Sequence, residues 1–323
     1  MEDLVIRGAT LVDGSGATAY TGDLAIKDGV ITQVGGRAGA AKREIQADGC
    51  IVAPGWIDVH THYDGQATWD PYLSPSTWHG VTTAIMGNCG MGFAPVHTDR
   101  RDWLIKVMEG VEDIPGSVLH EGLQWDWETF PEYLDALERR SFALDVGAQI
   151  PHSAVRAYVM GDRAIHHDEA TPKDLVAMRD IVREGMKAGA MGFSTTRTFI
   201  HKYDERKYPP GTFATADEIT GLGSVLGEVG HGVFQMTSNH PAMGGEIPWL
   251  YQLANRPCSR LVERYSKNTG WRSTRECAVV RRNLWTPRRP SLFPAKFTAS
   301  LYRTPDISIH CRPAARAARA KNA

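Results

Sequence analysis

The residues best suited to metal chemistry in this sequence begin with a histidine pair in GWIDVHTHYDG, residues 55–65. His60 and His62 are one residue apart, and side chains at positions i and i+2 of a β-strand point to the same face of the sheet. Imidazole nitrogens bind zinc and related divalent metals. Two ordinary core or surface histidines are the alternative. The preceding APGWID and the following Asp64 favour a metal site, in which we interpret Asp64 as a supporting carboxylate.

A cysteine that follows the next apolar run is the best candidate for a third ligand. Cys89 lies in MGNCGMGFAP, where the neighbouring glycines let the backbone come close to a ligand. Its thiolate could bind one zinc ion or bridge two, whereas a small buried thiol is the structural alternative. Because strand ends of a parallel barrel meet at one rim, we expect Cys89 to lie beside His60 and His62.

The elements that must position these side chains change in kind along the chain. Residues 4–54 are typical of short strands joined by tight turns, with a hairpin signal at Asp28-Gly29. After them, apolar strands alternate with amphipathic helices, which indicates a parallel sheet. Helices are expected to begin after Thr129, Thr171 and Thr215, and the first and last of these open a capping-box pattern. Strands are expected at residues 56–62, 81–89, 142–152, 190–197 and 232–239.

The composition of the chain changes abruptly near Arg256. Residues 256–323 hold 13 arginines and 3 lysines against 3 acidic residues, although the whole chain has a net charge of −1. This segment shows neither strand nor helix periodicity. One interpretation is a disordered basic tail. The other, which the composition favours, is the product of a reading-frame shift.

Bulk composition limits the class of protein. The chain has 323 residues, 42% of them hydrophobic and 23% charged, as in a globular protein. It shows no secretory signal and no apolar run of about 18 residues, so we expect no membrane association. Its 5 cysteines are too few for a disulfide framework, which predicts free or metal-bound thiols and a cytoplasmic location.

Two stretches of the sequence carry a resemblance to a known family. AIKDGVITQVG, followed by DGCIVAPGWIDVHTHYD, resembles the start of amidohydrolase-superfamily proteins. TWHGVTTAIMGNCGMGFAPV, residues 77–96, resembles the N-acyl-D-amino-acid deacylases, or D-aminoacylases. The resemblance covers about residues 4–255. It implies a metal-dependent hydrolase with a (β/α)8 barrel and a small composite β domain, acting on small N-acyl-D-amino acids with one or two divalent ions, zinc above all. His60, His62 and Cys89 match that family's metal ligands.

The sequence also departs from this family. The family takes further histidine ligands from the fifth and sixth strands and an aspartate base from the eighth. Here the fifth strand reads VFQMTSN and has no histidine, although His240 follows it. The sixth to eighth strands are not recognisable, so the catalytic base is unknown and the barrel is expected to be truncated after about five strands. We therefore expect poor folding in isolation and negligible deacylase activity.

These observations predict three regions: a composite β domain at 1–54, a partial barrel at 55–255 and a basic tail outside the family at 256–323.

Four further residues are candidates for binding the substrate carboxylate. Arg197, His201 and Lys202 follow the fourth expected strand at the same rim as the histidine pair, and His240 follows the fifth. A guanidinium group binds carboxylate through two parallel hydrogen bonds, which favours Arg197 for this role. His152, at the end of the third strand, could line the pocket or be a solvated loop residue.

Two other functions remain as alternatives. One is a cyclic-amide amidohydrolase similar to the hydantoinases, against which the Gly-Asn-Cys-Gly stretch argues. The other is a non-catalytic fragment whose basic tail binds an acidic partner. The tail lacks a folded recognition motif, so we do not expect nucleic acid as a partner.

Overall fold

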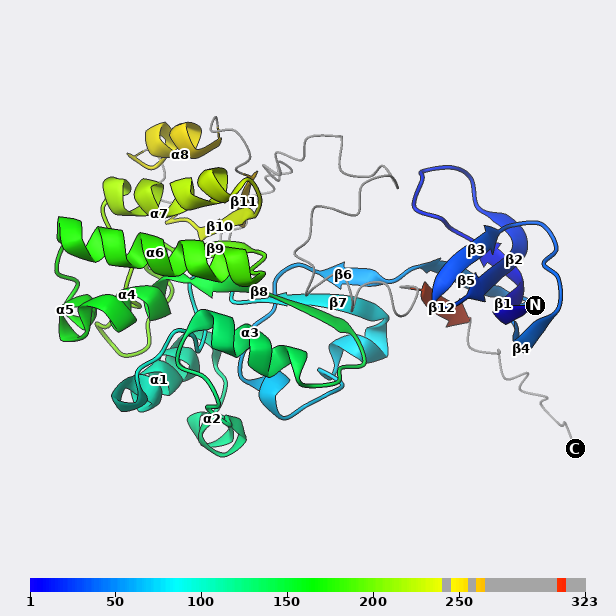
Figure 1. The fold of residues 1–323 in the computed structure, drawn as a ribbon, viewed down its shortest axis with the longest axis horizontal. Coiled ribbons are helices and arrows are strands. Elements are labelled where there is room, and N and C mark those ends of the chain that lie inside the picture. Colours follow the sequence, from blue (N-terminus) through cyan, green and yellow to red (C-terminus); the bar gives the residue numbers. More distant parts are fainter. Residues whose placement is uncertain (240–244, 255–259, 265–306, 312–323) are drawn as a thin grey trace, which may run out of the picture. The chain divides into compact units, whose positions relative to one another are not determined.

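The computed structural model describes residues 1–239, 245–254, 260–264 and 307–311 (Figure 1). These residues form two compact units, and each is described by itself. The first contains Met1–Ile57, Ser76–Thr82 and the strand at residues 307–311. The second contains Asp58–Pro75 and the described residues from Thr83 to Arg264.

The first unit is built on a six-stranded sheet in the order β12-β5-β1-β2-β3, with β4 paired to β1. The turn between β2 and β3 has positive φ at Asp28 (50°) and Gly29 (73°), so the expected hairpin turn is confirmed. The core of this unit is apolar. Cys50, which belongs to this core, is disulfide-bonded, contrary to the expectation of free or metal-bound thiols. The strands are β1 (Glu2–Leu11), β2 (Tyr20–Lys27), β3 (Val30–Val34), β4 (Ala41–Gln46), β5 (Cys50–Pro54) and β12 (Ile307–Cys311).

The second sheet also has six strands, in the order β11-β10-β9-β8-β7-β6. Neighbours from β7 to β11 pair in parallel, as the alternation of strands and helices predicted. The strands are β6 (Trp56–Asp58), β7 (Val81–Met86), β8 (Asp145–Pro151), β9 (Gly192–Thr196), β10 (Val233–Thr237) and β11 (Arg260–Arg264).

The strands are shorter than the sequence predicted, and β7 ends at Met86, so Cys89 lies on the loop after it and not at its end. Two differences affect the site and the sheet edge most. The strand expected at 56–62 ends at Asp58, so His60 and His62 lie on the irregular segment that follows it. The chain also adds β11 beside β10, beyond the point where the sequence lost its periodicity. A five-residue edge strand pairs through its backbone, and such pairing leaves little trace in side-chain pattern.

Helices follow the strands of the second unit, and α6 and α7 lie side by side (Figure 1). Helix α6 contacts β8, whereas α7 contacts β9 and β10. Among the described residues, no helix combines the length and apolar character needed to cross a membrane. The helices are α1 (Arg101–Glu112), α2 (Gly116–Gly122), α3 (Phe130–Glu138), α4 (His152–Met160), α5 (Asp162–Ile165), α6 (Pro172–Ala188), α7 (Ala216–Val229) and α8 (Ile247–Ala254), with 3₁₀ turns at Gln66–Thr68, Ser76–His79 and Thr98–Arg100.

The helix starts follow the sequence signals, with one informative exception. Thr129 and Thr171 each form a complete capping box at the start of α3 and α6. At α7, the Thr215 hydroxyl accepts a hydrogen bond from the Glu218 amide at 3.2 Å. The Glu218 carboxylate does not accept the reciprocal hydrogen bond from the Thr215 amide, so the capping box is incomplete. It turns instead towards other charged and polar groups inside the unit.

Those groups form a buried cluster that joins α4, α7 and β9. His152 Nε2 donates to Glu218 Oε1 at 2.9 Å, and Arg156 Nε donates to the same oxygen at 2.8 Å. The Thr195 hydroxyl lies 2.8 Å from His152 Nδ1. Burial raises the pKa of Glu218, but its hydrogen bonds to His152 and Arg156 outweigh this and hold the pKa below its usual value. His152 is fully buried at the start of α4, so it is not a solvated loop residue, and its role in lining a pocket stays a prediction.

Candidate metal centre

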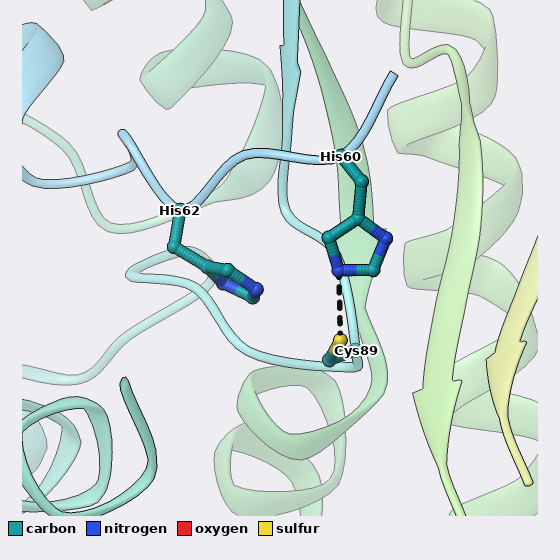
Figure 2. Close-up of side chains that lie close together, drawn as sticks. All are labelled: His60, His62 and Cys89. Carbon is teal, nitrogen blue, oxygen red and sulfur yellow. Dashed lines mark hydrogen bonds between the residues drawn. The ribbon is translucent and has the colours of Figure 1, made fainter. Parts of the chain in front are cut away.

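His60, His62 and Cys89 lie close together beyond the carboxyl ends of β6 and β7, and their side chains face one another (Figure 2). One ligand atom from each lies within 4.8 Å of the other two. His60 Nε2 and Cys89 Sγ are 3.1 Å apart, and the two imidazole rings meet edge to face at 5.4 Å between centroids. The structure therefore brings together the three residues that the sequence singled out.

The backbone at Cys89 adopts a conformation that is rare for a residue with a side chain. Its φ is +56°, in the left-handed region. Gln235 Oε1 accepts a hydrogen bond from the Cys89 amide at 2.8 Å, and the Thr237 hydroxyl donates one to Cys89 Sγ at 3.2 Å. Ser194 Oγ accepts a hydrogen bond from the next amide, that of Gly90, at 2.9 Å. Buried polar side chains on β9 and β10 thus fix this loop from inside the sheet.

Asn88 connects the cysteine loop to the histidine segment. Its side chain is fully buried, and its Nδ2 donates to the carbonyl of Thr61, which lies between the two histidines, at 3.1 Å. Gln149 Nε2 donates to Asn88 Oδ1 at 2.7 Å. The preceding Gly87 leaves room for this loop, because a Cβ there would lie 2.1 Å from the Gln149 carbonyl oxygen. Asn88 therefore couples the positions of all three candidate ligands.

Replacing Asn88 by alanine is expected to weaken divalent-metal binding about 10- to 100-fold, the usual effect of losing a group that orients ligands. The reason is that the Thr61 carbonyl and the Gln149 amide lose their buried partner. Metal affinity is measured by competition with a chromophoric chelator. The exposed amide Gln124 offers a matched control, and equal affinities for Asn88→Ala and Gln124→Ala would contradict this role.

Two aspartates flank the histidines in different environments. Asp58 Oδ1 accepts the His60 amide at 3.2 Å, which helps to shape the segment after β6. Asp64 is buried, and its loss of hydration raises its pKa to about 7. The nearby Glu112 carboxylate adds to this rise. The interpretation of Asp64 as a supporting carboxylate, not a metal ligand, stays a prediction.

Glu112 and His201 also lie at this site, and no pattern in the sequence predicted Glu112 there. Glu112 ends α1, and its Oε2 lies 3.3 Å from His62 Nε2. A ligand atom from each of Cys89, Glu112 and His201 lies within 4.8 Å of the other two. Thr196 Oγ1 lies 2.9 Å from His201 Nδ1, and burial lowers the pKa of His201 to about 4. An acidic residue near the end of an amphipathic helix resembles any solvent-facing one, so only the fold reveals Glu112.

The other candidates for substrate binding are placed differently. Arg197 Nε bonds Glu246 at 3.0 Å, and its Nη1 donates to the carbonyls of Thr212 and Ala214. Lys202 is exposed, with Nζ 5.6 Å from the centre of the Tyr208 ring. His240 lies outside the described residues. Substrate binding by these residues stays a prediction.

The donor set and spacing fit a divalent ion of the zinc type. Two ligand atoms on one tetrahedral zinc stand about 3.3–3.6 Å apart, given zinc–nitrogen and zinc–sulfur bonds of about 2.0–2.3 Å. For a nitrogen and a sulfur ligand the value is about 3.5 Å. His60 Nε2 and Cys89 Sγ, which are 3.1 Å apart, would therefore move apart by a few tenths of an ångström to bind one ion. Imidazole and thiolate are both ligands that zinc accepts.

The sequence of this chain is similar to those of known proteins. A model described as "Amidohydrolase family" matches residues 43–246. D-aminoacylase of Alcaligenes xylosoxydans xylosoxydans is 35% identical over 219 residues, which cover 67% of this chain and 40% of that protein. N-acyl-D-aspartate deacylase of the same organism is 37% identical, covering 67% of this chain and 39% of that protein. The chain thus spans about two fifths of the length of these curated relatives.

Solved structures lead to the same family. A structure of D-aminoacylase, described for its binuclear metal center, has a TM-score of 0.66 and 28% identity, covering 81% of this chain and 51% of that one. This likeness confirms the partial (β/α) barrel predicted from the sequence. D-hydantoinase of Ralstonia pickettii is 50% identical, but over 62 residues that cover 19% of this chain, which argues against the cyclic-amide alternative. The chain belongs to the amidohydrolase family.

Proposed function

We propose that this site hydrolyses the amide bond of N-acyl-D-amino acids and releases a carboxylate and a D-amino acid. The observation that carries the proposal is the convergence of His60, His62 and Cys89 beyond the carboxyl ends of β6 and β7 in an amidohydrolase-family chain. The names of two relatives, D-aminoacylase and N-acyl-D-aspartate deacylase, support this substrate class.

His60, His62 and Cys89 would hold a divalent metal, which we propose to be zinc because of their nitrogen and sulfur donors. When bound, such a metal lowers the pKa of a bound water towards 7 and polarises the scissile carbonyl. Asn88 and Gln235 hold the cysteine loop in place, which keeps the thiol facing the imidazoles. One or two ions are consistent with the binuclear center described for D-aminoacylase.

Arg197 is the residue we propose for the substrate carboxylate. Glu246 and two backbone carbonyls bond its Nε and Nη1, which fixes the plane of the guanidinium. We propose that its Nη2, for which the described residues show no hydrogen bond, donates to the anion. Lys202 would add positive charge near the same anion. No described residue is assigned as the general base, so we expect slow turnover by this chain. The cytoplasmic location and the absence of a nucleic-acid partner stay predictions.

The test is stereoselective, metal-dependent amide hydrolysis. The zinc-loaded chain is incubated with N-acetyl-D-methionine or N-acetyl-L-methionine, and the released amino acid is quantified. We expect slow release from the D enantiomer that stops after chelation and in the His60→Ala variant. Equal rates for the two enantiomers, or rates that survive chelation, would contradict the proposal. The exposed His166→Ala variant is the matched control and is expected to retain the rate.

A further inference from the structure

The hydroxyl of Thr237, the last residue of β10, donates its hydrogen bond to the sulfur of the candidate ligand Cys89. The two atoms are 3.2 Å apart, and His60 Nε2 lies 3.1 Å from the same sulfur. Among the described residues, the Thr237 hydroxyl makes no other hydrogen bond, and Thr237 is 8% exposed. A buried hydroxyl needs a partner, and here the metal-ligand group supplies it.

A sulfur atom is an unusual acceptor for a buried threonine in this unit. The hydroxyl of Thr68 donates to two backbone carbonyls, and that of Thr212 donates to one. A neutral thiol is a weak acceptor, whereas a hydrogen bond to a charged acceptor is about twice as strong as one between neutral groups. The hydrogen bond from Thr237 is therefore strongest when Cys89 carries the negative charge of a metal-bound thiolate.

The sheet fixes the direction of this hydroxyl. Strand β10 pairs with β9 on one side and with β11 on the other, and both registers extend to Thr237. Threonine branches at Cβ, which restricts rotation about its first side-chain bond. Gln235, two residues earlier on the same face of β10, accepts a hydrogen bond from the Cys89 amide. Strand β10 thus holds the cysteine at its backbone and at its sulfur.

We propose that Thr237 is a positioning residue that sets the donor strength of the Cys89 thiolate. Hydrogen bonds to metal-bound sulfur tune the properties of copper and iron–sulfur sites. Because the hydroxyl draws charge from the sulfur, a bound ion keeps more of its positive charge, and this charge is what polarises a carbonyl. The proposal rests on the metal dependence proposed above, but not on the identity of the substrate.

Cobalt spectroscopy of the full chain tests this role. The metal-free chain is titrated with Co²⁺, the thiolate-to-cobalt charge-transfer absorption is recorded, and affinity is measured by chelator competition. Thr237→Val keeps the shape of the side chain but removes the hydroxyl, so the filled sulfur orbitals rise in energy and the band is expected to move to longer wavelength. The same variant is expected to bind cobalt about 10- to 100-fold more weakly, the usual effect of losing a group that supports a ligand.

Two variants show whether the hydroxyl itself causes these changes. Thr237→Ser keeps the hydroxyl, so its band is expected at the parental wavelength. Thr68→Val is the matched control, because Thr68 is also buried and its hydroxyl bonds to backbone carbonyls. This control is expected to leave both the band and the affinity unchanged.

The outcomes separate this inference from the proposed function. An unshifted band in Thr237→Val, or an equal shift in Thr237→Ser, overturns the role of the hydroxyl and leaves the deacylase proposal standing. A parent chain that binds no cobalt overturns both this role and the metal dependence. Circular dichroism establishes that each variant is folded, and if Thr237→Val does not fold, Thr237→Ala, which also lacks the hydroxyl, decides the outcome.

Discussion

Replacing Cys89 by alanine is expected to weaken the binding of the first metal equivalent at least about 100-fold, more than the loss of an orienting group. Cys89 belongs to both groups of candidate ligands that lie at this site, so its loss leaves each group with only two ligand residues. Alanine also removes the contact between Cys89 Sγ and the Thr237 hydroxyl. Affinity is measured by chelator competition, and the cobalt charge-transfer absorption is expected to disappear.

A serine at position 89 is the informative companion variant. It preserves the size of the side chain and can still contact Thr237, but a hydroxyl is a much weaker zinc ligand than a thiolate. We expect Cys89→Ser to bind metal nearly as weakly as Cys89→Ala while unfolding at the same denaturant concentration as the parent chain. If both variants retained parental affinity, Cys89 would be a structural thiol and not a ligand.

Replacing Arg156 by methionine is expected to lower the free energy of unfolding by about 3–5 kcal/mol, the usual cost of stranding a buried charge. Arg156 donates to Glu218 and to the carbonyl of Asp168, and the Glu218 side chain is 1% exposed. Without the guanidinium, the carboxylate keeps only His152 as its partner in this cluster. Denaturant unfolding followed by circular dichroism measures the loss.

Two further variants show whether charge or packing causes this loss. Arg156→Met combined with Glu218→Gln removes both charges, so its cost is expected to be clearly smaller than that of Arg156→Met alone. Arg206→Met changes an exposed arginine and is expected to stay within about 0.5 kcal/mol of the parent chain. An additive double variant would show that the two side chains do not interact.

The sequence predicted those parts of the site that depend on strand order. The histidine pair and Cys89 lie on the segments that follow β6 and β7, which are neighbours in the sheet, so their convergence follows from topology. The predicted extent of the first strand, 56–62, was wrong, because an apolar run does not reveal where hydrogen bonding to the neighbouring strand stops. Glu218 shows a different limit, since its capping-box position gave no sign that its carboxylate bonds His152 and Arg156.

The residues that hold the cysteine loop in place form a sequence pattern that could have predicted their role. Gln235 and Thr237 are two positions apart in β10, so they share one face of the strand, and both are buried. Polar side chains on the buried face of a strand require partners, which points to a loop or site within reach. Glu112 left no comparable signal, because its role depends on where the end of α1 meets His62.

The distance along the chain between Cys89 and its partners sets the order of events during synthesis. Gln235 and Thr237 lie 146 and 148 residues after Cys89. A ribosome adds about 5–20 residues per second, so β10 is made roughly 7–30 s after the cysteine. The nascent chain therefore carries its histidines and thiol without the groups that orient them. Capture of a metal in the final arrangement must wait for β10, which makes site assembly a late event in the life of the growing chain.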